Sequence, residues 1–349
     1  MRGRRHGNLP AAARVSCTMT IVSLLVLFAC AARAPVVLYP LDQHQPPAAL
    51  VGVFASQSPD ALFEDAYSRL LNDDLEGAEQ RLVYLAGLPD GPPEALYHLG
   101  VVYELRGALE TAISAYDLLL TQDPPEELAP SVHFRRGLCL EELGRFDEAL
   151  KAFAKVPTTG GLSLNDRVTY DVARGVAMLG SGKEAKGLEL LTAALSTTRR
   201  DPELAWILGK GWYTLARHDL DQAAALSLNE SERKVKKNLE ARAGLIMDAE
   251  ADLVHVVEQH EPEWILRGLL DLGDAYITLR EDMMRSPTPA GLSAEQAALY
   301  VAQVDKSTRV LIAKAFNAYD QGLIVAGTLG FEGELTETLR ARRDALPTD

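Results

Sequence analysis

Histidine and glutamate side chains stand close together at one point of the chain, where they could bind a metal ion. His255, Glu258 and His260 lie within six residues, and zinc-binding helices carry these residue types at short spacing. Their order is neither His-Glu-x-x-His nor His-x-x-Glu-His, and no third ligand stands nearby in the sequence. The glycine pair at 160–161 lacks the lysine and the serine or threonine of a phosphate-binding loop. We therefore expect no catalytic residue, no metal and no cofactor.

A different chemistry, covalent lipid attachment, is indicated at Cys30. Residues 1–29 carry four arginines ahead of the apolar stretch 21–29, which is the pattern of an export signal. That stretch is too short to span a bilayer as a helix. It ends in Leu27-Phe28-Ala29-Cys30, which resembles a bacterial lipobox, with a phenylalanine where a smaller residue is usual. We predict that residues 1–29 are removed and that Cys30 becomes lipidated.

The residues around Cys30 also bear on localisation. The two that follow it are alanines and not the aspartate that holds bacterial lipoproteins at the inner membrane, so we expect a periplasm-facing lipoprotein of the outer membrane. The alternative is ordinary cleavage at Ala29-Cys30-Ala31 or Ala32-Arg33-Ala34. That cleavage would release a soluble periplasmic or secreted protein.

Charge restricts the class of partner. The chain has 35 basic and 49 acidic residues, a net charge of -14, and loss of the four arginines in residues 1–29 makes the mature chain more acidic. Such a surface repels phosphate backbones and anionic lipid. We therefore expect no nucleic-acid binding. Residues 30–59 contain five prolines without helical periodicity, so we predict a semi-extended tether there.

Small residues recur along the rest of the chain at a near-constant interval. Three columns run in step, and a period of this length is typical of a solenoid built from helical hairpins. The columns are Gly100, Gly137, Gly175, Gly209 and Gly273, then Gly107, Gly144 and Gly182, and then Ala112, Ala149 and Gly187.

One unit shows the reason for the pattern. Apolar and small residues from Leu96 to Tyr103 follow three-four spacing, which places them on one face of a helix. Gly107 ends that helix, and a second begins near Leu109. Small residues such as Gly100 and Ala112 let the two helices approach closely.

At these positions the chain resembles the tetratricopeptide repeat family. The unit at 93–124 matches the family pattern in register, the following units match more weakly, and a degenerate first unit covers 61–88 with Ala66 and Ala78 in the small positions. The resemblance implies an all-α right-handed superhelix with the repeat array at 60–227. Its residues in the unit at 93–124 are Leu96, Leu99, Gly100, Tyr103, Gly107, Ala112, Tyr116 and Pro124.

Beyond residue 227 the spacing lengthens. A long amphipathic helix is predicted from Asn229 or Ser231 to Gln259, and its start carries a basic cluster at 233–237. A split last repeat follows: its first helix, from Pro262 to Arg285, ends at a proline-rich segment, and its second begins at Ser293 with an N-cap pattern. Ala315 stands 42 residues after Gly273, whereas Ala112 stands 12 after Gly100. We assign 228–327 to this extended region and 328–349 to a closing helix. The last repeat resembles the C-terminal segment of tetratricopeptide proteins in the envelope machinery of gliding and predatory bacteria.

The resemblance implies a membrane-anchored adaptor that binds other envelope proteins through extended or helical segments. The envelope complexes in question serve assembly, secretion, pilus formation or gliding motility. Two alternatives remain: a secreted soluble repeat protein, and a peptidoglycan hydrolase or its accessory. Candidate partner-binding residues are polar positions on the first helices of the hairpins that packing does not demand: His98, Glu104, His133, Arg135, Arg136 and Lys210.

Overall fold

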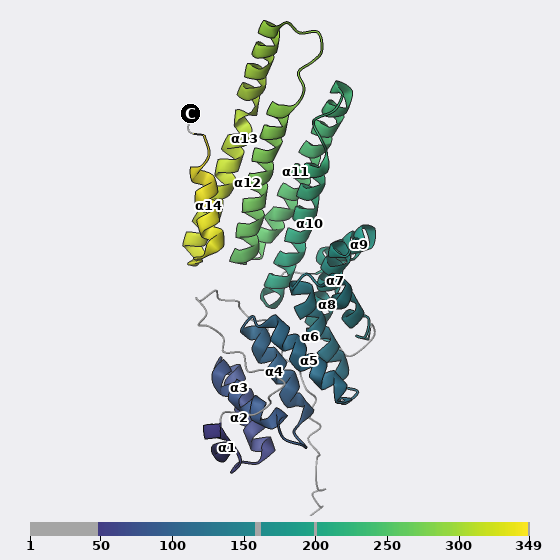
Figure 1. Ribbon diagram of the computed structural model, residues 1–349, viewed down its shortest axis with the longest axis vertical. Coiled ribbons are helices and arrows are strands. Elements are labelled where there is room, and N and C mark those ends of the chain that lie inside the picture. The colour runs from purple at the N-terminus through teal and green to yellow at the C-terminus, as the bar shows by residue number, and fades with distance from the viewer. Residues whose placement is uncertain (1–47, 158–161, 199–200, 348–349) are drawn as a thin grey trace, which may run out of the picture.

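The computed structural model describes residues 48–157, 162–198 and 201–347. Within these ranges the regular structure is helical, and successive helices pair into hairpins that stack along the molecule (Figure 1). The predicted all-α solenoid of helical hairpins is confirmed. The helices are α1 (Ala48–Phe54), α2 (Pro59–Leu71), α3 (Leu75–Ala86), α4 (Pro93–Leu105), α5 (Leu109–Thr121), α6 (Ala129–Glu142), α7 (Phe146–Phe153), α8 (Leu164–Gly180), α9 (Glu184–Thr197), the 3-10 turn η2 (Pro202–Leu204), α10 (Ala205–Ala225), α11 (Glu232–Glu258), α12 (Pro262–Arg285), α13 (Ala294–Leu329) and α14 (Glu334–Asp344).

The turn within each short hairpin needs a left-handed backbone. Gly107, Gly144 and Gly182 have φ values of 69°, 71° and 77°, a region that glycine enters without steric cost. In the first hairpin, Asp73 takes the equivalent place with φ 62°. The second glycine column therefore marks the turns, and its absence from the first unit made that unit look degenerate.

The first glycine column marks where the two helices of a hairpin touch. A Cβ on Gly100 would come within 3.0 Å of the Tyr116 ring, and Gly137 faces Phe153 in the same way. Both partners stand 16 residues after their glycine. Gly175 meets Leu191 at that same separation, while Ala112, Ala149 and Ala315 are completely buried. Gly273 meets Tyr319, 46 residues on, because both arms of that hairpin are longer.

Gly209 departs from this rule. A Cβ there would meet Trp264 at the start of α12, in the next hairpin, and not the second helix of its own hairpin. The helices α10 and α11 still pack as a hairpin through Ala216, Leu220 and Ile246. The predicted boundary at residue 227 therefore separates two helices that belong to one hairpin.

The N-terminal part of the described chain also differs from expectation. Residues 30–59 were expected to form a tether, yet α1 occupies 48–54 and Phe54 is buried against Tyr84, with ring centroids 5.5 Å apart. A seven-residue helix is too short to show periodicity in the sequence. The predicted signal at 1–29, the lipidation site Cys30 and the tether up to residue 47 lie outside the described residues.

The long helices begin close to where the sequence predicts them. Ser231 occupies the N-cap position of α11 without a capping hydrogen bond from its side chain. The Ser293 side chain accepts a hydrogen bond from the backbone of Gln296 in a capping box at the start of α13. The hairpins α10–α11 and α12–α13 project together from the short-hairpin array, and α14 covers one end of α13 (Figure 1). The core has three clusters, centred on α1–α8, on α8–α10 and on α10–α14.

Candidate partner-binding surface

All six predicted partner-binding residues lie on first helices, two on α4, three on α6 and one on α10. They were chosen on the premise that packing leaves their side chains unpaired. The structure corrects that premise for four of them: Glu104, Arg135, Arg136 and Lys210. Their role toward a partner stays a prediction.

Glu104 and Arg135 bind one another across neighbouring hairpins. The Arg135 Nη1 donates to Glu104 Oε2 at 2.8 Å, and the Tyr116 hydroxyl donates to Glu104 Oε1 at 2.5 Å. Both charged side chains are mostly buried, with exposed fractions of 20% and 14%. This network joins α4, α5 and α6, so its main effect is to hold the hairpins together.

Arg136 and His133 lie on another side of α6. The Arg136 guanidinium donates to Asp117 of α5 at 2.5 and 3.4 Å. Burial and the neighbouring positive charges of Arg136 and Lys155 lower the pKa of His133. His133 is half-buried and stays neutral near pH 7.

Lys210 forms the most buried ion cluster of the described chain. Its Nζ donates to Glu141 at 2.7 Å and to Glu142 at 2.6 Å, both at the end of α6, and lies 5.2 Å from the centre of the Trp206 ring. Burial opposes the charged ammonium, but the two carboxylates prevail and raise the pKa of Lys210. Burial raises the pKa of Glu141. Because α6 and α10 belong to alternate hairpins, this cluster closes the first-helix face between them.

His98 has aromatic neighbours in place of an ionic partner. Its ring centre lies 5.5 Å from that of Phe63 and 5.3 Å from that of Tyr67, both on α2. Burial and the nearby Arg135 lower the pKa of His98 to about 4, so the ring is neutral at pH 7. Phe63, Tyr67 and His98 are half-buried, and we call these three residues the aromatic patch.

The aromatic residues beside His98 were not predicted, although the sequence carries a signal for Phe63. An aromatic residue stands three positions before the small residue on four of the first helices. These residues are Phe63, Tyr97, Phe134 and Trp206. Tyr97 and Phe134 are buried, while Phe63 and Trp206 are half-buried.

The candidate zinc residues do not converge. The His255 Nδ1 lies 3.1 Å from Glu258, and the His255 ring stacks on Trp212 at 4.3 Å beside a cavity of about 360 Å³. In the part of the chain that the structure describes, no three histidine, cysteine or acidic residues are placed to share a metal ion. Across those same residues, no helix has the length and apolarity to cross a membrane.

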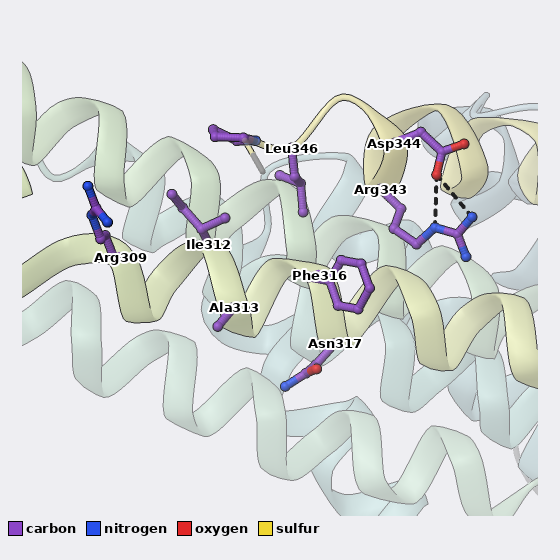
Figure 2. Close-up of a pocket in the computed structure, with 9 residues that line it drawn as sticks. Arg309, Ile312, Ala313, Phe316, Asn317, Arg343, Asp344 and Leu346 are labelled. Carbon is purple, nitrogen blue, oxygen red and sulfur yellow. Dashed lines mark hydrogen bonds and ion pairs between the residues drawn. The ribbon is translucent and has the colours of Figure 1, made fainter. Parts of the chain in front are cut away.

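A larger cavity of about 630 Å³ lies on the outer side of α13. Ile312 and Phe316 lie on the side of α13 that faces Leu346, and Arg343 closes one end with Asp344 (Figure 2). The Arg343 side chain also binds Asp320 of α13 at 3.2 Å. The floor of this groove is therefore apolar, and its charged end is already paired.

Comparison with known proteins adds to this geometry. The family model described as tetratricopeptide repeat matches residues 63–127 and 126–160. No curated protein matches the sequence. Among solved structures, a TPR repeats protein from Bacteroides fragilis is similar at 13% identity over 73% of this chain and 99% of its own, with a TM-score of 0.32. A tetratricopeptide repeat protein from Parabacteroides merdae is similar at 15% identity over 81% and 98%, with a TM-score of 0.39.

The matched segment includes the hairpins α4–α5 and α6–α7, in which a glycine of the first helix faces an aromatic ring of the second. Residues 63–160 are therefore assigned to tetratricopeptide repeats.

Proposed function

We propose that the protein is a non-catalytic adaptor that is anchored in the bacterial envelope by a lipid at Cys30 and binds another envelope protein on its first-helix face. Tetratricopeptide repeats are protein-binding scaffolds. The observation that carries the proposal is the aromatic patch. Its three rings come from two adjacent first helices and remain partly accessible.

The chemistry of the aromatic patch favours one kind of ligand. His98 is uncharged at neutral pH, and Phe63 and Tyr67 present ring faces and edges that pack against apolar or aromatic side chains. The acidic chain around the patch favours neutral or basic flanking residues in the bound segment. The proposed ligand is therefore an extended or helical protein segment with an apolar or aromatic anchor.

Farther along the same face, the side chains of this chain already fill the space. Glu104 is bound to Arg135, and Lys210 is bound to Glu141 and Glu142. A ligand there would have to displace mostly buried ion pairs, which is costly. The N-terminal end of the array is therefore the better binding surface.

The experiment is site-specific photocrosslinking in membranes. A photoreactive residue at Tyr67 is expected to capture a discrete envelope protein, identifiable by mass spectrometry. The matched control places the same residue at Leu71, which is half exposed on the same helix but outside the aromatic patch. Capture that is equal at both positions, or that survives His98→Ala, would contradict the proposed surface.

Anchoring is tested separately. Metabolic labelling with radioactive palmitate is expected to mark the protein, and Cys30→Ala is expected to abolish the label and release the protein from membranes. A labelled Cys30→Ala variant, or a wild-type protein recovered unlabelled from the soluble fraction, would favour the secreted form instead. The partner classes are envelope assembly, secretion, pilus and gliding-motility complexes.

A further inference from the structure

The first turns of α13 are mostly apolar and exposed to solvent. Residues 294–303 contain one charged residue, Glu295, and Leu299, Tyr300 and Val301 expose 66%, 38% and 41% of their surface. Arg280 of α12 binds Asp305 at 2.5 Å, and α12 ends at Arg285, so α13 extends past its neighbour (Figure 1). Contiguous apolar surface of this kind marks an interaction site.

The groove on the same helix is the complementary feature. It is floored by Ile312, Ala313 and Phe316 and continues the surface on which α14 packs (Figure 2). The short helix α14 packs on one end of the 36-residue helix α13, and α12 packs along another side of it. One molecule thus presents both an apolar helix end and an apolar groove.

On one side of α13, the intervals between successive residues form a palindrome. Eight residues recur there at intervals of 3, 1, 3, 4, 3, 1 and 3, which places them along one stripe of the helix. We call these eight the outer stripe: Ala298, Val301, Ala302, Asp305, Arg309, Ile312, Ala313 and Phe316.

We propose that the outer stripe binds a second copy of this chain, with the two α13 helices antiparallel about a twofold axis between Asp305 and Arg309. This arrangement places Ala298 of each copy against Phe316 of the other, and Ala302 against Ile312. The small residues come from the uncovered helix end and the large ones from the groove. Large and small side chains then interdigitate, as close packing requires.

Charge distinguishes this arrangement from the parallel one. Antiparallel pairing places Asp305 opposite Arg309 of the other copy, whereas parallel pairing in register would place Asp305 opposite Asp305. Asp305 keeps its contact with Arg280, and Arg309 approaches Asp305 of its own helix at 3.6 Å. Residues 292–347 carry six basic and seven acidic residues. This end of the molecule is therefore close to neutral within a chain of net charge -14, so two copies meet there with little repulsion.

The size of the contact sets the expected strength. The stripe from Ala298 to Phe316 is about 27 Å long at ~1.5 Å per residue. With a width of about 10 Å, the diameter of one helix, the stripe covers on the order of 270 Å², which is less than the ~800 Å² per partner of a standard stable interface. Micromolar association is therefore expected, with a symmetric dimer as its end point.

The test is sedimentation velocity of the full chain carrying Cys30→Ala, so that no lipid contributes to association. The protein is measured between about 1 and 500 μM, a range that brackets micromolar dissociation constants. Ala298→Lys and Phe316→Glu are each expected to weaken dimerisation about 10- to 100-fold, because each places one charge against apolar surface. The double variant is expected to restore the dimer, because the two new charges meet across the twofold axis and lie about 27 Å apart within one chain.

Val310→Glu is the matched control. Val310 is 59% exposed on the same helix but lies about a third of a turn away from Phe316. The Val310→Glu variant is therefore expected to dimerise as strongly as the wild type. Thermal unfolding checks that all variants fold. A wild type that remains monomeric at the highest concentration, or a double variant that is no better than the singles, overturns the proposal.

Discussion

The short hairpins α4–α9 and the long hairpin α12–α13 obey one packing rule with different arm lengths, from which the hairpin α10–α11 departs at Gly209. In both regions a glycine of the first helix faces a ring of the second, as Gly100 faces Tyr116 and Gly273 faces Tyr319. The 30 extra residues between Gly273 and Tyr319 lengthen the arms toward their tips. A helical hairpin tolerates this insertion because its packing contacts repeat along the helix and do not depend on where the turn lies.

The two regions differ in how they bury charge. The short hairpins pair charges on their first helices, as in Glu104 with Arg135. In the long hairpins, the pairs between helices include Arg242 with Asp282 and Arg280 with Asp305, nearer the projecting ends. Lys210 connects the regions, since it extends from α10 back to α6. First helices also pair charges in the long hairpins, as in Arg217 with Asp271, so the pairs nearer the projecting ends are what the extension adds to the short array.

The largest effect is expected at this junction. Lys210→Met should lower the free energy of unfolding by about 3–5 kcal/mol, because Glu141 stays buried without its cation. The pKa of Glu141, already raised by burial, rises further without that cation. The folded variant then binds the extra proton, so its deficit should shrink as the pH falls from 7 toward 5.

Urea unfolding at both pH values measures the Lys210 effect. Lys183→Met is the control, because Lys183 forms an exposed pair with Asp147 at 3.9 Å and should cost less than about 1 kcal/mol. If Lys210→Met and Lys183→Met lower the free energy of unfolding equally, the buried ion cluster at the junction stabilises the fold no more than an exposed ion pair does.

A smaller loss is expected within the short array. Arg135→Glu should lower the free energy of unfolding by about 2–4 kcal/mol, because it places two carboxylates together beside the Tyr116 hydroxyl. This outcome would contradict the prediction from the sequence that packing does not demand Arg135. Calorimetry measures the loss of stability. The double variant Glu104→Gln with Arg135→Gln should be more stable than Arg135→Glu, because it removes the repulsion between the carboxylates.

The aromatic patch should make stability depend on pH. The pKa of His98 is about 4 in the folded chain against an ordinary 6.5, so the unfolded chain binds more protons between these values. Stability should therefore fall as the pH falls through this window, by up to ~3 kcal/mol. His98→Phe should flatten the difference between unfolding curves at pH 7 and pH 4.5. An identical pH dependence in both proteins would mean that His98 is protonated in the folded state.

The smallest effects should differ in sign between the regions. Gly107→Ala should destabilise by about 1 kcal/mol, because the turn needs φ of 69°. Gly244→Ala should stabilise by about 0.5–1 kcal/mol, because Gly244 lies inside the exposed helix α11 with nothing near a new Cβ. Chemical denaturation resolves both, and two changes of equal sign would show that these glycines serve the same role.

Local chemistry was enough to predict most of the fold. The columns of small residues predicted the hairpins, Ser231 and Ser293 marked the starts of α11 and α13, and the proline-rich segment after Arg285 marked the end of α12. Each of these signals acts within about one helical turn or one hairpin, where spacing along the chain determines which residues meet. The sequence did not reveal α1, because its seven residues carry no usable period.

The partner-binding surface depended on tertiary structure. Residues 98, 104, 135 and 210 look alike in the sequence, as polar positions on first helices, yet one lies among rings and three are held in ion pairs. Glu141 and Lys210 are 69 residues apart in the sequence, and whether they meet depends on how three successive hairpins stack. Sequence by itself thus determined which helices pair within each short hairpin and within α12–α13, but not that α10 pairs with α11. Tertiary structure alone decided which charges meet between hairpins, because small rotations at each interface accumulate along the solenoid.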